Sequence, residues 1–350
     1  MEMWANIVGG SFVNHNLQGG ELLHEAIDKG VVNVARYYHH ETVRVGGQDD
    51  DIRGNVRRGL DITKATNYRP EISMPPPSTA GRHISRKGQN SSAAGRKRSS
   101  SCTDVPLPPS KRTCSSSPVK GGRATANRVH RRIIVRDFGK AIYKASSRVS
   151  LLAALEGCIV GYELLHTRAG MLQCDISPNN LMVNEEDDNP SWRAFLIDLD
   201  LAIKEQREKS SGARGKTGTR AFMAIGVLLD DELHSFMHDL ESFFRVLFWI
   251  CIHYDGPTKE RVVSQFEKWN NIGTEELAKI KKGEVADERD FLKAVEENFT
   301  PYFQPLIPYV NRLRRKLFPN GGRWRDPNPK LYLEMKEILQ AAQDGLKDLE

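Results

Sequence analysis

The first part of the chain shows apolar residues first at helical spacing and then in strand-like runs. An apolar stripe predicts one short helix that ends at Gly30, and its members are Leu22, Leu23, Ala26 and Ile27. Residues 31–45 are rich in valine and tyrosine and lead into Gly46-Gly47, which predicts a strand pair closed by a turn. These elements fit the edge of a small sheet.

Helical periodicity dominates from residue 149 onward. Residues 149–165 keep their large apolar side chains near one face, whereas residues 238–254 are apolar on nearly every side, which predicts a helix buried within a core. Further helices are predicted at residues 275–282, 287–298, 309–317 and 332–349, and short strands at 132–135, 181–183 and 195–197. The C-terminal two-thirds is therefore expected to be mainly α.

Residues 70–128 interrupt this pattern with Ser, Pro, Arg, Lys and Gly. Residues 80–132 contain 13 Lys and Arg against the single acid Asp104, a local net charge of +12 within a chain of net charge +6. Such a segment buries too little apolar surface to offset the entropy of ordering, so we expect disorder. Its basic groups Arg96–Arg98 and Lys111–Arg112 have the spacing of a two-part nuclear import signal, and a solvated basic linker is an equal alternative.

Cysteine usage and hydropathy limit the class of protein. Five widely spaced cysteines, with no C-x-x-C pair, favour reduced thiols in an intracellular protein, nuclear or cytoplasmic. No uninterrupted apolar run approaches the ~18 residues of a membrane span, so no membrane contact is expected. The remainder of the chain has a net charge of −6, which argues against a uniformly basic fold that binds specific nucleic acids.

One constellation of polar residues has the composition of a phosphoryl-transfer site. Asp175 is followed five residues later by Asn180, and Asp198 ends the second of two short apolar strands. Phosphoryl transfer requires a carboxylate near the acceptor hydroxyl, and an amide oxygen and a second carboxylate are suitable ligands for magnesium. The spacing alone is weak evidence, but its place between two long helices strengthens it.

Four motifs in order resemble the fungal-type protein kinase family. They are DISPNNLM, LIDLDLA, GTRAFMA and HDLESFFRVLFWIC, and the similarity runs from about Asn127 to Leu349 and more thinly from Trp4 to Leu60. The resemblance implies an α+β, protein-kinase-like fold with a mainly α C-lobe and a partial β-rich N-lobe. The expected organisation is a partial N-lobe at residues 1–69, a disordered basic insertion at 70–128, and a hinge and C-lobe at 129–350.

The resemblance also implies roles for individual residues. Asp175 corresponds to the catalytic carboxylate, Asn180 and Asp198 to ligands of Mg²⁺ and the bound ATP, and Asp239 to the buried anchor of the catalytic loop. Thr219 is placed to reach Asp175. ATP and Mg²⁺ are the implied cofactors, and a Ser or Thr side chain of a protein is the implied acceptor. The literal Asp137-Phe138-Gly139 precedes the catalytic loop, so we place it in the connector between lobes.

The chain departs from the kinase pattern at several positions. Gln173-Cys174 stand where kinases have His-Arg, and Ala224-Ile225-Gly226 stand where they have Ala-Pro-Glu, so the anchoring carboxylate is missing. Cys174 has no His or Lys beside it in the local sequence, which favours a degenerated position over a reactive thiol.

The first residues lack a glycine-rich loop and a strand lysine, with Met1 near the lysine position and Glu21 as the expected helix glutamate. The sequence is consistent either with a start inside the lobe or with a lobe that has lost these parts.

Three hypotheses remain open from sequence. The first is an ATP-dependent Ser/Thr protein kinase, supported by Asp175, Asn180 and Asp198. The second is a catalytically impaired pseudokinase or kinase fragment that acts as an interaction module, which would explain Cys174 and the missing lysine. The third, a small-molecule phosphotransferase of the same fold, is disfavoured by GTRAFMA, which resembles a segment that seats a peptide.

Overall fold

The computed structural model describes residues 6–14, 19–56, 58, 60, 128–205, 218–229, 232–257 and 259–347. These residues belong to one compact unit. The predicted disordered insertion, with its two basic groups, therefore lies outside the described residues, apart from its last residue.

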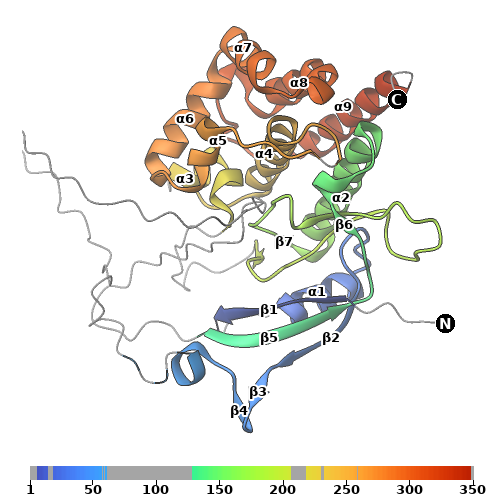
Figure 1. Cartoon of the computed structure of the whole chain (residues 1–350), viewed down its shortest axis with the longest axis vertical. Coiled ribbons are helices and arrows are strands. Elements are labelled where there is room, and N and C mark those ends of the chain that lie inside the picture. Colours follow the sequence, from blue (N-terminus) through green and yellow to red (C-terminus); the bar gives the residue numbers. More distant parts are fainter. Residues whose placement is uncertain are drawn as a thin grey trace, which may run out of the picture. The chain divides into compact units, whose positions relative to one another are not determined.

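The N-terminal region is a three-stranded antiparallel sheet with one helix beside it (Figure 1). The strands occur in the order β1 (Asn6–Asn14), β5 (Arg128–Val135) and β2 (Tyr37–Thr42), and the predicted short helix is α1 (Gly19–Asp28). Gly46 and Gly47 have positive φ and turn the chain between β3 (Arg44–Val45) and β4 (Gln48–Asp49). A one-turn helix, η1 (Ile52–Val56), follows.

The prediction of a strand pair over residues 31–45 is wrong in its first strand. Val34 makes only an isolated parallel bridge to Leu196, and Ala35 donates a backbone hydrogen bond to the same residue at 2.8 Å. The apolar residues Val31, Val34 and Ala35 are buried against the C-terminal region rather than paired along a strand. Their apolar pattern therefore reflects burial and not sheet pairing.

Two small sheets and the helix α2 (Arg148–Ala169) form the inner part of the C-terminal region. One sheet contains β6 (Lys140–Ala141), β8 (Leu181–Val183) and β9 (Ala194–Leu196) in this order. In the other sheet, β7 (Met171–Leu172) pairs with β10 (Ile203–Lys204). The side chain of Ser147 caps the start of α2, and Gly170, with φ of 62°, ends it. The predicted helix at 149–165 is thus confirmed and extends by four residues at its C-terminal end.

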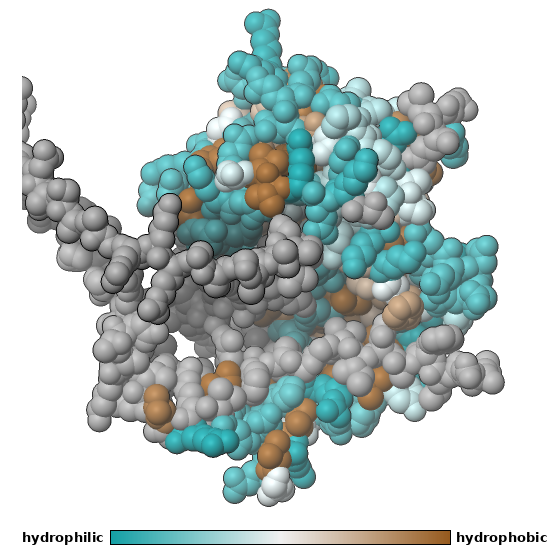
Figure 2. Space-filling view, in the orientation of Figure 1, coloured by the Kyte–Doolittle hydropathy of each residue, from teal (hydrophilic) through white to brown (hydrophobic). Residues whose placement is uncertain are grey.

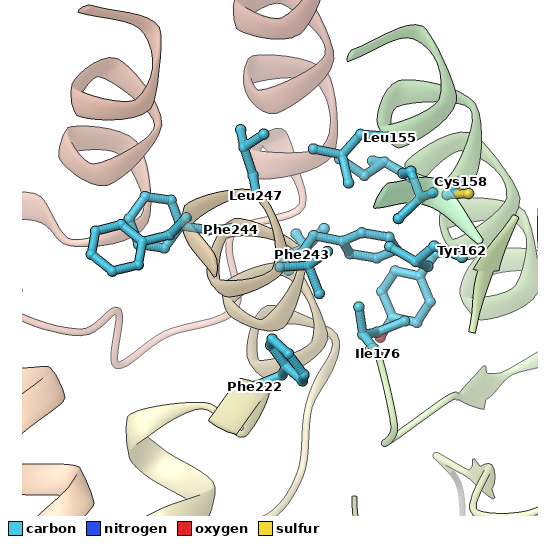
Figure 3. Packing of buried hydrophobic residues seen from close by; sticks show 14 of the residues in the cluster. Leu155, Cys158, Tyr162, Ile176, Phe222, Phe243, Phe244 and Leu247 are labelled. Carbon is cyan, nitrogen blue, oxygen red and sulfur yellow. The ribbon is translucent and has the colours of Figure 1, made fainter. Parts of the chain in front are cut away.

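The helix α4 (Phe236–His253) lies at the centre of the core, as its uniformly apolar sequence predicts. All of its residues except Met237 are buried. Figure 3 shows Phe243 and Leu247 of α4 on the side toward Leu155 and Tyr162 of α2, with Phe244 on the opposite side. Because this helix is buried on every side, any polar group on it needs a partner inside the protein.

The remaining helices include the four predicted at residues 275–282, 287–298, 309–317 and 332–349, with ends that differ by a few residues, and two short helices that were not predicted, α3 and α5. They are α3 (Ile225–Leu229), α5 (Ser264–Glu267), α6 (Thr274–Ala286), α7 (Glu288–Asn298), α8 (Ile307–Leu317) and α9 (Lys330–Leu346). Short 3₁₀ segments are η3 (Ile142–Lys144), η4 (Arg220–Phe222), η5 (Lys268–Asn270), η6 (Pro301–Leu306) and η7 (Pro319–Gly321). The C-terminal region is mainly α.

Helix α2 is long and apolar enough, by length and composition alone, to cross a membrane. Half of its most apolar window is buried inside the protein, where α2 packs against β9 and α9. The buried core helix of a soluble protein passes the same test, so this feature is weak evidence for a membrane span. On the face drawn in Figure 2, apolar side chains occur in small separate patches on a largely hydrophilic surface.

Candidate functional site

Asp175 lies in the loop between β7 and β8, and three hydrogen bonds hold its carboxylate. Oδ1 accepts from the backbone N–H of Thr219 at 2.7 Å and from its hydroxyl at 2.9 Å, and Oδ2 accepts from Asn180 Nδ2 at 3.2 Å. The residue is 7% exposed. The structure thus shows the contact that the sequence suggested between Thr219 and Asp175, and it fixes the orientation of a buried carboxylate.

Only the nitrogen end of the Asn180 side-chain amide forms hydrogen bonds with described residues. Its Nδ2 donates to the backbone carbonyl of Asp175 at 2.8 Å and to the Asp175 carboxylate. Its Oδ1 is buried and has no hydrogen-bond partner among the described residues. A buried amide oxygen without a donor costs free energy unless something binds it, and an amide oxygen is a suitable ligand for Mg²⁺.

Asp198 follows β9 and is tied through its neighbour to residues 173–180, which we call the catalytic loop after the kinase motif that they resemble. Ile197 donates a backbone hydrogen bond to the carbonyl of Asn180 at 3.0 Å, so the metal-ligand candidates Asn180 and Asp198 come from adjacent, paired segments. Asp198 is half-buried, has a φ of 64° and accepts from the backbone N–H of Asp200 at 3.3 Å. Carboxylate and amide oxygens together fit a hard divalent cation.

Gln173 forms a second link between the catalytic loop and the strand that ends in Asp198. Its Nε2 donates to the carbonyl of Ile197 at 3.0 Å and to that of Asp198 at 3.5 Å. Sequence reasoning treated Gln173 only as a departure from the kinase pattern. A long amide directly before a Cys-Asp pair gave no clue that it would join two segments.

Asp239 holds the catalytic loop from the first turn of α4. Its Oδ2 accepts from the backbone N–H groups of Gln173 at 3.0 Å and Cys174 at 3.2 Å, and its Oδ1 lies 2.8 Å from Nε2 of His234. Burial raises the pKa of Asp239, but the charge of His234 and these hydrogen bonds lower it by more, so the pKa lies below its ordinary value. The structure shows this residue in contact with backbone amides, as sequence reasoning expected.

Cys174, His234 and Asp239 bring three possible metal-ligating atoms within 4.8 Å of one another. Their hydrogen bonds already satisfy them, because Asp239 is fully engaged and the Cys174 thiol contacts the carbonyl of Leu172 at 3.7 Å. Burial lowers the pKa of His234, but Cys174 and Asp239 raise it by more, to well above its ordinary value. We therefore interpret the cluster as a hydrogen-bonded network that contains a charged imidazole.

The expectation that no histidine lies beside Cys174 holds only in the local sequence. His234 reaches the thiol from sixty positions away, a separation that leaves no signal in the sequence. Burial still raises the pKa of the Cys174 thiol, so the thiol is not activated as a nucleophile. Cys174 itself has a φ of 63°, a left-handed backbone held by the Asp239 hydrogen bond.

Gly218 lets the segment that carries Thr219 approach the catalytic loop. Its φ is 111°, and a Cβ atom there would lie 2.6 Å from the carbonyl oxygen of Cys174. Only glycine fits this close approach. The preceding residues 206–217 lie outside the described part of the chain.

Glu21 is not brought together with the other predicted residues. It is exposed in the first turn of α1 and has no ion pair among the described residues. Glu25, one turn later, pairs with Lys204 of β10 and with Lys29, and these contacts lower its pKa. The start of α1 also lies against Asp200, because a Cβ on Gly19 would meet the Asp200 carboxylate.

The strand next to α1 in sequence has no lysine. β1 reads NIVGGSFVN and pairs with β5 along its length. In protein kinases the lysine that contacts the nucleotide phosphates is on a strand of this region. Met1, which the kinase resemblance places near the lysine position, lies outside the described residues.

Asp137 is far from the role that its Asp-Phe-Gly spelling suggests. It is 1% exposed, and its carboxylate accepts from the backbone and guanidinium of Arg36, with a closest side-chain distance of 2.7 Å. It follows β5 and holds the connector between the two regions. This placement agrees with the sequence interpretation.

Comparison with known proteins gives two findings. A family model described as fungal protein kinase matches residues 14–251. The serine/threonine-protein kinase RUNKEL of Arabidopsis thaliana is 30% identical over 90 residues, which are 26% of this chain and 6% of that protein. The chain therefore matches only a small part of the length of this curated relative.

Proposed function

The chain belongs to the fungal protein kinase family, and from this premise we propose that it transfers the γ-phosphoryl group of ATP to a Ser or Thr hydroxyl of a protein. Asp175 is the proposed catalytic carboxylate, which orients the acceptor hydroxyl and accepts its proton. Asn180 and Asp198 are the proposed ligands of Mg²⁺. The kinase resemblance read from the motifs is confirmed at the level of the family.

The observation that supports this proposal most strongly is the divided use of the Asn180 amide. Its Nδ2 holds the Asp175 loop, while its buried Oδ1 has no donor among the described residues. Buried side-chain amides usually have both ends hydrogen-bonded, so the open Oδ1 of Asn180 is a candidate ligand atom. The amide oxygen of Asn180 and the carboxylate of Asp198 are of the type that Mg²⁺ prefers, and a bound Mg²⁺ would neutralise charge that develops on the transferred phosphoryl group.

The residues of the chain itself fix the geometry of proton acceptance. Thr219 and Asn180 donate to opposite oxygens of Asp175, so the carboxylate cannot rotate freely. Asp239 holds the backbone of the preceding two residues from α4. A carboxylate fixed in this way presents an oriented acceptor to an incoming hydroxyl, which lowers the entropy cost of the reaction.

A protein substrate is supported by the segment that contains Thr219. Gly218 and Thr219 connect this segment directly to the catalytic carboxylate. The curated relative is a serine/threonine-protein kinase by name. These two points favour a peptide hydroxyl over a small-molecule acceptor.

A catalytically impaired interaction module is the second candidate, and two observations favour it. Strand β1 lacks a lysine, and Cys174 occupies the position that is usually arginine in kinases. A chain of this kind would bind partners through the same fold without turnover. Activity of the purified protein separates the two candidates.

The test measures phosphate transfer from radiolabelled ATP with Mg²⁺ to a mixed protein substrate. The purified chain is compared with Asp175→Asn and with Asp188→Asn, a matched change at an exposed acid. We expect Asp175→Asn to lower turnover by about 10²–10⁴-fold and Asp188→Asn to leave it unchanged. Equal turnover in all three proteins would exclude Asp175 as the catalytic residue, and no turnover in the unmodified chain would favour the interaction module.

A further inference from the structure

The segment that carries Thr219 lacks the carboxylate that usually anchors it in kinases. At that position stands Gly226, in α3. A Cβ atom on Gly226 would lie 2.4 Å from Nε2 of His238 and 2.8 Å from both the Arg323 guanidinium and the Glu232 carboxylate. The space of a side chain is therefore already filled by groups from other parts of the chain, and the anchor must come from elsewhere.

Lys281 of α6 is directed at this segment. Its side chain is fully buried, and its Nζ donates to the backbone carbonyls of Ala221 and Met223, each at 2.7 Å. The ammonium lies 5.1 Å from the centre of the Trp269 ring. Both carbonyls belong to the turn that directly follows Thr219, so the lysine holds the part of the segment nearest to Asp175.

Glu241 of α4 holds the same segment two residues later. Its Oε1 accepts from the backbone N–H of Ile225 at 3.1 Å and pairs with Arg245 at 3.2 Å. Arg245 pairs in turn with Glu284 of α6 at 3.0 Å. Lys281 and Arg245 thus lie with Glu241 and Glu284 in one buried cluster between α4 and α6.

The geometry does not depend on the charge of Lys281. Burial and the neighbouring charge of Arg245 lower the pKa of Lys281 to well below its ordinary value, although Glu241 and Glu284 act against this shift. A neutral amine still has two N–H groups, as many as the two carbonyls require. The charges alone also do not account for the stability of this cluster, because a buried ion pair can often be replaced by apolar residues without loss of stability.

We propose that Lys281 and Glu241 are positioning residues that hold the segment 219–225 against the catalytic loop and thereby set the seat of the substrate peptide. This inference rests on the proposed protein kinase function. The anchor that kinases usually place on the segment itself is supplied here by two helices that pack beneath it. The carbonyls of Ala221 and Met223 and the amide of Ile225 are the atoms through which these helices act.

The test compares Lys281→Met with Lys282→Met in the full chain. Methionine keeps an unbranched side chain that is one atom shorter and has no donors, and Lys282 is the exposed neighbour on the same helix. Hydrogen exchange of residues 219–229 is measured by mass spectrometry, together with the Michaelis constants for protein substrate and for ATP. We expect Lys281→Met alone to show at least tenfold faster exchange in this segment and a higher Michaelis constant for the protein substrate. Its Michaelis constant for ATP and the exchange of α2 should be unchanged.

The two readouts separate the failure of this inference from that of the proposed function. Unchanged exchange and an unchanged substrate constant in Lys281→Met would overturn the positioning role, whatever the activity of the unmodified chain. A chain without phosphotransfer whose segment loosens in Lys281→Met would contradict the kinase proposal and support the anchor.

A second pair of variants covers the case in which Lys281→Met fails to fold. Glu241→Gln keeps an oxygen that can accept from Ile225, whereas Glu241→Leu does not. We expect faster exchange of the segment in Glu241→Leu alone. Equal exchange in the two variants would overturn the inference.

Discussion

The catalytic loop and the N-terminal sheet differ in how completely they provide the parts of the proposed phosphotransfer site. In the loop, Asp175 and Asn180 are held by direct hydrogen bonds, and Asp239 fixes their backbone from the buried helix. In the sheet, β1 has no lysine, and the glutamate of α1 that forms an ion pair does so with Lys204 of β10. The difference indicates that the part proposed to handle the acceptor and the metal is held by many hydrogen bonds, whereas β1 offers no lysine to the nucleotide phosphates.

The largest expected effect comes from removing the anchor of the ordered half. Asp239→Ala leaves two buried amides and a charged imidazole without their acceptor, so we expect a loss of about 3–5 kcal/mol in the free energy of unfolding. Asp198→Ala removes a half-buried carboxylate, and its cost should stay below about 1 kcal/mol. Urea denaturation of both variants decides the matter. Equal midpoints would contradict the anchoring role.

The core helix of the ordered half should also give the protein acid sensitivity. Burial lowers the pKa of His253 to about 4 from 6.5, so the unfolded chain binds the proton more readily between these values. Stability is therefore retained above pH 6.5 and lost as the pH falls toward 4, by up to about 3 kcal/mol. His253→Phe keeps a ring stacked on Trp249 and removes the titration. Its unfolding free energy should vary less over this range, and an unchanged pH dependence would refute the assignment.

Restoring the arginine of the kinase pattern should not improve the ordered half. Cys174 is 6% exposed and lies beside the charged His234, so Cys174→Arg adds bulk and a second cation to a filled space. We expect a loss of about 1–3 kcal/mol in stability and no rise in phosphotransfer, with Cys174→Ser as the size-matched control. A strong activation by Cys174→Arg would show that the arginine, and not the phosphate contacts, limits the enzyme.

The smallest effect is expected where the N-terminal helix meets the ordered half. Lys204 and Glu25 are each about one-third exposed, so their ion pair contributes less than about 1 kcal/mol. Lys204→Met should raise the hydrogen exchange of α1 a few-fold and leave that of α4 unchanged. Lys144→Met, at an exposed lysine, is the control. Unchanged exchange in α1 would show that this ion pair does not hold the helix.

Much of the fold could be predicted from local pattern, because helices such as α2 and α4 have long, regular apolar spacing. The exception at residues 31–35 arises because burial against another segment and pairing in a strand give the same apolar pattern. Asp175, Asn180, Asp198 and Asp239 were identified by their place in ordered motifs, and the structure shows the contacts of Asp239 and Thr219.

Other parts of the site could not be predicted because they depend on contacts between distant segments. His234 meets Cys174 across sixty positions, and Lys281 meets Met223 across 58. Neither spacing has a signature in sequence. Glu21 was predicted to be the helix glutamate from its distance to nearby glycines. In the structure, the face that α1 turns toward its neighbours carries Glu25, which forms the ion pair with Lys204.

The most direct test of the account is calorimetric titration of the chain with ATP in the presence and absence of Mg²⁺, beside Asp198→Asn and the exposed control Asp188→Asn. We expect Mg²⁺ to tighten ATP binding by at least about tenfold, equivalent to about 1.4 kcal/mol, in the unmodified chain and in Asp188→Asn. Asp198→Asn should lose this gain and keep its fold. ATP binding that is independent of Mg²⁺ in the unmodified chain, or a full Mg²⁺ effect in Asp198→Asn, would contradict the proposed metal site.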